Sequence, residues 1–155
     1  MHLIKIKLHQ KGSSLIEVMV ALTILAVGLL GMAQLQNRSS QDNQTAYYYS
    51  QAVFLAEDLA ERMRSNPTAH SDYEIALDDT LSTVSTTRCE TGNCTASQLA
   101  SWDLKRWKDD LAELLPQGDG SVTSVGDGYA FVVQFDDSRG KADSVPASFT
   151  FRVRF

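Results

Sequence analysis

The sequence predicts an α+β fold in which one long N-terminal helix, apolar in its first half, packs on a small C-terminal antiparallel sheet with one extra short helix. Three observations favour it. An apolar run without a charge, residues 18–33, leads into a helical pattern that continues to Ser65. A second helical pattern lies at residues 95–115, and the last 30 or so residues are rich in alternating β-forming residues.

The long helix is predicted for residues 14–65. After the apolar run, small and apolar residues recur at three- and four-residue steps, the spacing of one buried stripe. The stripe consists of Ala52, Leu55, Ala56, Leu59 and Met63, extended backwards by Tyr48. Asn66-Pro67 ends the helix, because a residue before proline is pushed out of the helical region. The first half must find lipid or other subunits to pack on.

The apolar first half is long enough for a membrane. Residues 15–35 approach the roughly 20 residues that a span requires. Lys5, Lys7 and Lys11 predict a cytoplasmic N-terminus and a body outside. An ordinary secretory signal peptide cut near residues 31–33 is an alternative. Glu17 fits poorly in such an apolar core, and the helical pattern continues past that point.

Charge and composition exclude several functions. The formal net charge is −5, and the leader holds three of the 14 basic residues. An acidic body argues against nucleic-acid binding, which needs clustered positive charge. His70 is the one histidine beyond the leader, no nucleophile or phosphate-binding motif occurs, and we expect neither an enzyme nor a cofactor. The glycine-flanked Asp119 and Asp127 predict turns rather than calcium loops.

Cys89 and Cys94 predict a disulfide that closes a tight loop, as expected for an exported domain. A metal site is disfavoured because there are two thiols and no histidine nearby. The surrounding segment, residues 67–94, is polar and is predicted to be a loop with little regular structure.

The second helix is predicted to begin with a capping box formed by Thr95 and Gln98. Its apolar face consists of Leu104, Trp107, Leu111, Leu114 and Leu115, widened by Leu99 and Trp102. Pro116 and Gly118 stop it. Both tryptophans are interpreted as core residues rather than as a ligand cage.

Two strands are predicted at residues 129–135 and 149–155, joined by a loop over residues 136–146. A shorter strand near residues 121–125 precedes them, followed by a turn at residues 126–128. In the last strand, one face is apolar and consists of Phe149, Phe151, Val153 and Phe155.

The N-terminal junction carries the most specific chemistry. Glu17 is the fifth residue after Gly12, and an acidic group inside a membrane segment costs a few kcal/mol. Cutting after Gly12 would free an α-amine on Ser13, one helical turn from Glu17. The amine and the carboxylate can pair within one chain or between neighbouring helices. We expect the second pairing to set the register of assembled subunits.

Residues 11–17 resemble the class III leader of type IV pilins, which prepilin peptidase cuts after the glycine. That family usually has phenylalanine after the cut, and its amine becomes N-methylated; this chain has Ser13 there, the candidate for methylation. Further segments are similar to the minor pilin family PilV, also called type IV pilus modification protein. They are residues 14–22, 28–36, 60–67, 94–107 and 114–118.

The resemblance implies a pilin-like fold and a low-abundance subunit that helps to prime pilus assembly, located at the fibre tip. The implied partners are prepilin peptidase, other minor pilins and the major pilin. The chain would cross the inner membrane once, with a periplasmic body, before joining a cell-surface pilus.

The expected organisation is a cleaved leader (1–12), a membrane and fibre-core segment (13–35) and a periplasmic domain (36–155). Two other readings stay open: a minor pseudopilin of a type II secretion system, and a membrane-anchored periplasmic binding domain that does not assemble.

Overall fold

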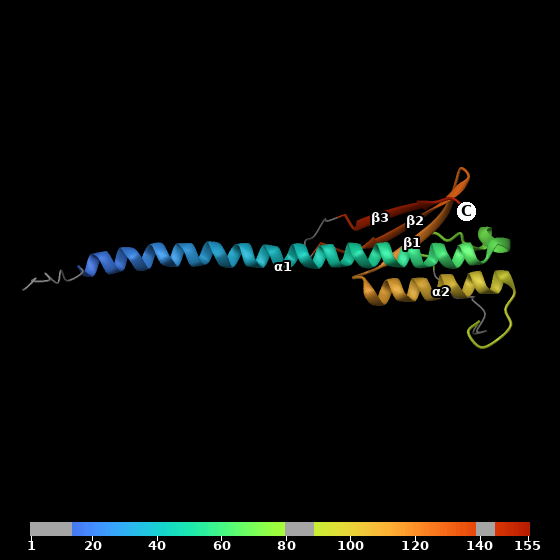
Figure 1. Cartoon of the computed structure of the whole chain (residues 1–155), viewed down its shortest axis with the longest axis horizontal. Helices are drawn as coiled ribbons and strands as arrows, with labels where there is room; N and C mark the ends of the chain where they lie inside the picture. The colour runs from blue at the N-terminus through green and yellow to red at the C-terminus, as the bar shows by residue number, and fades with distance from the viewer. Residues whose placement is uncertain (1–13, 80–88, 139–144) are drawn as a thin grey trace, which may run out of the picture. The chain divides into compact units, whose positions relative to one another are not determined.

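The computed structural model describes residues 14–79, 89–138 and 145–155. The elements follow the order α1 (Leu15–Ser65), the 3-10 helix η1 (Pro67–Tyr73), α2 (Ala96–Leu114), β1 (Asp119–Val125), β2 (Gly128–Phe135) and β3 (Ala147–Val153) (Figure 1). The chain divides into two compact units, one ending at Asn43 and the other running from Gln44 to Phe155. The predicted α+β arrangement is confirmed.

The first unit is described from residue 14 and consists of the beginning of α1. Its large apolar side chains are exposed along the whole stretch from Leu15 to Leu35. The most apolar window of α1 has a mean hydropathy of 2.4 and is 0% buried. By length and composition this helix is able to cross a membrane.

The second unit holds the core. In the C-terminal part of α1 the predicted stripe is confirmed: Ala52, Leu55, Ala56, Leu59 and Met63 are all buried. Tyr48 packs against the same core. The helix ends at Ser65, as the Asn66-Pro67 pair predicts.

The loop predicted for residues 67–94 is wrong at its beginning, where the chain forms η1. Pro67 suits the first position of a helix, because its missing N–H would have no partner there. Ala69 and Tyr73 point inward and are buried, which the polar composition around them concealed. Beyond η1, Ile75 forms a β-bridge with Val122 of β1. Residues 80–88 lie outside the described residues.

Helix α2 begins with the predicted capping box. The Gln98 N–H donates to the Thr95 hydroxyl at 3.2 Å, and the Thr95 N–H donates to the Gln98 side chain at 2.9 Å. The prediction for Leu114 is wrong: it is 44% exposed, whereas Leu115 is buried. The backbone becomes extended at Leu115, which turns that side chain into the core.

Trp107 is a core residue, as expected, and is buried against two elements. Its indole Nε1 donates to the Leu55 carbonyl at 3.0 Å, joining α2 to α1. A Cβ atom on Gly120 would lie 2.4 Å from the Trp107 ring, so only glycine allows β1 to approach so closely. Trp102 differs from the prediction, since it is only half-buried.

The sheet has the order β1-β2-β3, and both pairs are antiparallel. The three predicted strands are confirmed, with β3 beginning two residues earlier than expected and ending at Val153. The β1–β2 turn contains Gly126, whose φ of 63° favours glycine. Phe131 pairs with Phe151, and Val133 pairs with Phe149. Inward residues of β2 complete the core between the sheet and the two helices.

Candidate processing and assembly site

Glu17 lies in the first turn of α1. The Glu17 and Val18 N–H groups donate to the Ser14 carbonyl at 3.0 and 3.3 Å, which starts the helical hydrogen bonding. A carboxylate in a first turn interacts favourably with the positive end of the helix dipole. Glu17 therefore stabilises the beginning of the helix.

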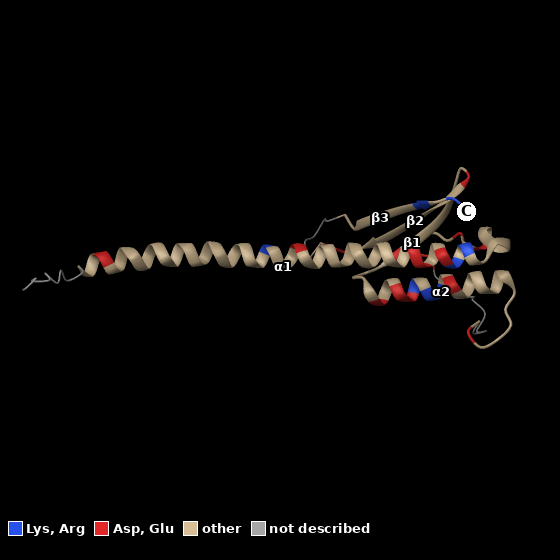
Figure 2. Cartoon of the chain, viewed as in Figure 1, with Lys and Arg blue, Asp and Glu red and all other residues tan. Residues whose placement is uncertain are grey.

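The surroundings of Glu17 are apolar and exposed. Leu15, Ile16, Val18 and Met19 all have large exposed fractions. Figure 2 shows one acidic position at the beginning of α1, followed by a long stretch without charge. Among residues 14–79, 89–138 and 145–155, the Glu17 carboxylate has no hydrogen bond or ion pair. It is a charge placed on a surface otherwise suited to lipid or to another helix.

Two residues of the predicted site, Gly12 and Ser13, lie outside the described residues. The position of the predicted amine relative to Glu17 is therefore outside what the structure describes. The cleavage site at Gly12–Ser13 and the methylation of Ser13 stay predictions.

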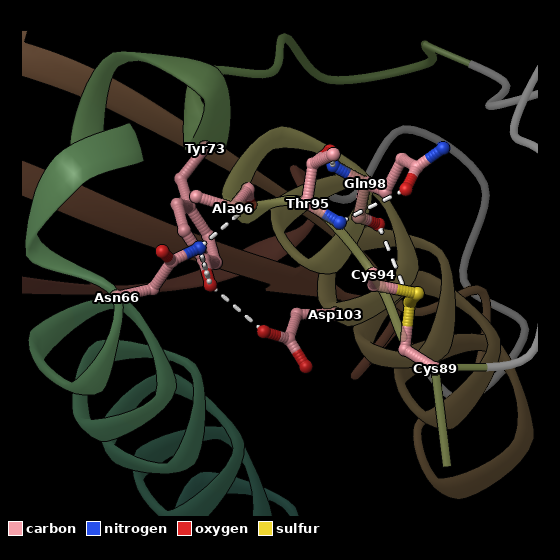
Figure 3. The surroundings of a disulfide bond; sticks show 8 residues. All are labelled: Asn66, Tyr73, Cys89, Cys94, Thr95, Ala96, Gln98 and Asp103. Atoms are coloured by element: carbon pink, nitrogen blue, oxygen red, sulfur yellow. Dashed lines mark hydrogen bonds between the residues drawn. A yellow bond between two sulfur atoms is a disulfide. The ribbon is translucent and has the colours of Figure 1, made fainter. Parts of the chain in front are cut away.

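Cys89 and Cys94 are joined in the structure as a disulfide, with their Cα atoms 5.6 Å apart. The loop that it closes lies directly before α2 (Figure 3). Arg106 of α2 pairs with Glu90 in this loop at 2.6 Å. The disulfide closes the loop, and the ion pair joins the loop to the middle of α2.

Sequence reasoning missed a buried polar network beside this loop (Figure 3). The Tyr73 hydroxyl donates to Asp103 at 2.8 Å, and Arg62 approaches the other oxygen of Asp103 at 3.3 Å. The Asn66 amide donates to the Ala96 carbonyl at 2.8 Å and to the Tyr73 hydroxyl at 3.4 Å. The network ties the end of α1 to η1 and α2.

The charges in this network compensate one another. Burial raises the pKa of the Tyr73 phenol, and the hydrogen bond and charge of Asp103 raise it further, so the hydroxyl stays a donor. Arg62 also pairs with Asp58 at 2.8 Å.

One signal of this network was visible in the sequence: Asp103 lies within the apolar stripe of α2, between Leu99 and Trp107. A carboxylate in such a position requires partners.

A separate ion pair joins α2 to β1. Lys108 pairs with Asp119 and also donates to the Ala76 carbonyl at 3.1 Å. Burial alone would raise the pKa of Asp119. Hydrogen bonds from the Asp78 backbone N–H, Lys108 and the Gly120 N–H outweigh it and bring the pKa below its ordinary value. Asp119, which the sequence placed in a turn, stabilises the body of the domain.

The described parts of the chain, 14–79, 89–138 and 145–155, contain no group of three or more His, Cys, Asp or Glu placed to hold a metal ion. The Arg62–Asp103 and Lys108–Asp119 pairs instead join elements of the second unit.

Comparison with known families gives two matches. Residues 34–105 match the family model described as type IV pilin Tt1218. Residues 7–33 match the prokaryotic N-terminal methylation motif. Searches of curated proteins and of solved structures found no match.

These two matches adjoin at residues 33 and 34 and cover both halves of α1. The methylation motif covers Gly12, Ser13 and Glu17. The pilin model covers η1, the cysteines and the beginning of α2. Type IV pilins are structural proteins, and the fold described above is pilin-like. The chain is similar to type IV pilins over residues 34–105 and carries a prepilin-type motif over residues 7–33, which together support a pilin role.

Proposed function

We propose that this protein is a minor pilin of a type IV pilus, of the PilV kind, which helps to initiate pilus assembly at the fibre tip together with other minor pilins. The observation that carries the proposal is the isolated Glu17 carboxylate on an exposed apolar helix, within the methylation motif. A helix that serves only as a membrane anchor gains nothing from a charged side chain, because burying that charge in lipid is costly.

The chemistry of the junction explains how Glu17 is used. Prepilin peptidase cuts between Gly12 and Ser13 and frees an α-amine, which then becomes methylated. In the assembled fibre this amine, on a neighbouring subunit, pairs with Glu17. Pairing a buried carboxylate is strongly favoured over leaving it alone, so the ion pair selects one register among helices that apolar contact alone would let slide.

The proposed location of the protein is based on the same apolar segment of α1. Before assembly, residues 13–35 cross the inner membrane once, with the N-terminus in the cytoplasm and residues 36–155 in the periplasm. After assembly, the same apolar surface packs among other pilins. One surface therefore serves in two environments, because both are apolar.

The first experiment determines the N-terminus of the mature protein by mass spectrometry. A methylated Ser13 at the N-terminus is expected. A mature chain that begins at Gln34 would identify a secretory signal peptide and end the proposal.

The second experiment deletes the protein and counts surface pili. Loss of pili, restored by the wild-type chain, is expected of an initiating subunit. Normal piliation together with a secretion defect would instead identify a pseudopilin, and normal piliation with normal secretion would identify a passive anchor.

A further inference from the structure

The outer edge of the sheet lacks a partner among the described residues. Strand β2 pairs on both sides, and β1 has the Ile75–Val122 bridge along its other edge, with N···O distances of 3.0 and 2.9 Å. Strand β3 pairs only with β2 within the described part of the chain. Figure 1 shows β3 as the outermost strand. An unpaired edge offers a row of backbone donors and acceptors to another strand.

The core is also less covered at β3 than at β2. Phe131 and Val133 of β2 are fully buried, and each is paired with a phenylalanine of β3 that points to the same face. Those partners, Phe151 and Phe149, are only half-buried. The apolar face of the sheet therefore continues to β3. The side chains that pack on this face bury these two residues of β2 fully but leave their β3 partners half-buried. One more strand with inward apolar residues would cover them.

The outward face of β3 supplies a charge. Ser148, Thr150 and Arg152 alternate on it and are exposed. In the described part of residues 44–155, Arg152 is the one Lys or Arg without an ion pair. The six others are Arg62, Arg64, Lys105, Arg106, Lys108 and Arg154. In a chain with a net charge of −5, an unpaired arginine on an open edge indicates an acidic partner.

There is space beside Arg152 for that partner. An open groove is lined by the β1–β2 turn and the end of β3, residues 125–129 and 152–154. Asp127 lies in this groove, but Arg154 already pairs with it at 2.8 Å. A carboxylate that pairs with Arg152 would therefore come from a partner rather than from Asp127.

We propose that the β3 edge accepts an extended strand from a different pilin subunit, by antiparallel or parallel strand addition. The added strand has apolar residues that cover Phe149 and Phe151, alternating with polar residues that include a carboxylate next to Arg152. A second copy of β3 does not fit, because Ala147–Val153 contains no acidic residue and would bring a second arginine. This proposal rests on the proposed pilin role. Strand addition at β3 would be one of the contacts through which the pilin binds another subunit.

The test in cells places a photo-crosslinking residue at Ser148, on the outward face of β3. The matched control position is Thr123, which is exposed on β1. The expected product is a crosslink from residue 148 to another processed pilin, identified by mass spectrometry, with little from residue 123. Arg152→Glu should reduce the product about tenfold, whereas Arg152→Lys should retain most of it.

The control for charge is Lys105→Glu, an equal charge change on α2 at a solvent-exposed pair that leaves β3 intact. The proposal is overturned if the crosslink forms mainly with a second copy of this chain, if it survives Arg152→Glu, or if it is absent while pili form normally. This last outcome leaves the pilin role standing. A mature N-terminus other than Ser13, or normal pili after deletion, would instead overturn the pilin role.

A binding measurement isolates the strand contact. The full chain in detergent is titrated with a synthetic peptide of alternating valine and glutamate, followed by fluorescence anisotropy. Two competitors are used, the same peptide with lysine in place of glutamate and the same peptide with alternate backbone amides N-methylated. Both should bind at least about tenfold more weakly, and Arg152→Glu should reverse the preference between glutamate and lysine. Equal binding of all three peptides would refute strand addition.

Discussion

The two halves of α1 are both rich in apolar residues, but only one of them finds partners within the described chain. Side chains of residues 15–35 are exposed, whereas Leu55, Leu59 and Met63 are buried against α2 and the sheet. The carboxylates differ in the same way. Glu17 has no partner among the described residues, while Asp103 and Asp119 each have several. The first half exposes its apolar side chains, whereas the second half packs in the core of the second unit.

The largest expected effect is on assembly, through Glu17→Ala. We expect incorporation into surface pili to fall by more than about tenfold, because the register among apolar helices loses its ion pair. The thermal unfolding midpoint of the body should not change. Incorporation is measured by immunoblotting sheared pili, with Glu57→Ala, an exposed acid in the other half of α1, as the control. Unchanged incorporation of Glu17→Ala would remove the distinction between the two halves.

The next effect is on the stability of the fold, and we expect it from the second half of α1 rather than from the first. Leu59→Ala should destabilise the body by about 2–5 kcal/mol, because it leaves a cavity in a packed core. Leu30→Ala in the same helix, at a side chain that is 66% exposed, should cost less than about 0.5 kcal/mol in detergent. Near-UV circular dichroism during thermal unfolding compares the two variants. Similar losses in both would mean that the first half also packs within the monomer.

A smaller loss is expected from the buried network. Asp103→Asn keeps the shape but removes the charge that faces Arg62 and weakens the bond from Tyr73, so a cost of about 1–3 kcal/mol follows. Tyr73→Phe should cost a similar or smaller amount. A double-mutant cycle measured by urea unfolding gives their coupling. Strictly additive losses would show that the 2.8 Å hydrogen bond between these residues contributes little.

The features that could be predicted from the sequence are those that depend on residues close together in the chain. Local signals were enough for the α1 stripe, the Thr95–Gln98 capping box and the three strands, because each depends on neighbours in sequence. Reasoning failed where a residue depends on distant ones: η1 is held by Tyr73 reaching Asp103, 30 residues away. Leu114 was misplaced because the backbone turns at the next residue. Gly12, Ser13 and Glu17 lie within the matched methylation motif. The pairing of the Ser13 amine with Glu17 stays a prediction, because the pairing that we propose involves a second subunit.

The smallest effect concerns pH and the paired carboxylate Asp119. Its pKa is lowered in the folded state, so its contribution to stability is fully present above the unfolded value near 4 and is lost as the pH falls through the folded value. Asp119→Asn should therefore be less stable than wild type by about 1 kcal/mol at pH 7. The difference should shrink steadily below about pH 4, because the wild-type carboxylate then becomes protonated.

Thermal unfolding of both proteins at pH 7 and pH 3 measures this change, with Asp109→Asn as the matched control. Asp109 pairs with Lys105 at 2.7 Å, but its side chain is 66% exposed. Solvent screens such a pair, so we expect a change of less than about 0.5 kcal/mol at either pH. If Asp109→Asn and Asp119→Asn behaved alike, burial between α2 and β1 would not be what distinguishes the Asp119 pair. The contrast between carboxylates paired inside the body and Glu17, which we propose pairs with another subunit, would then rest on assembly alone.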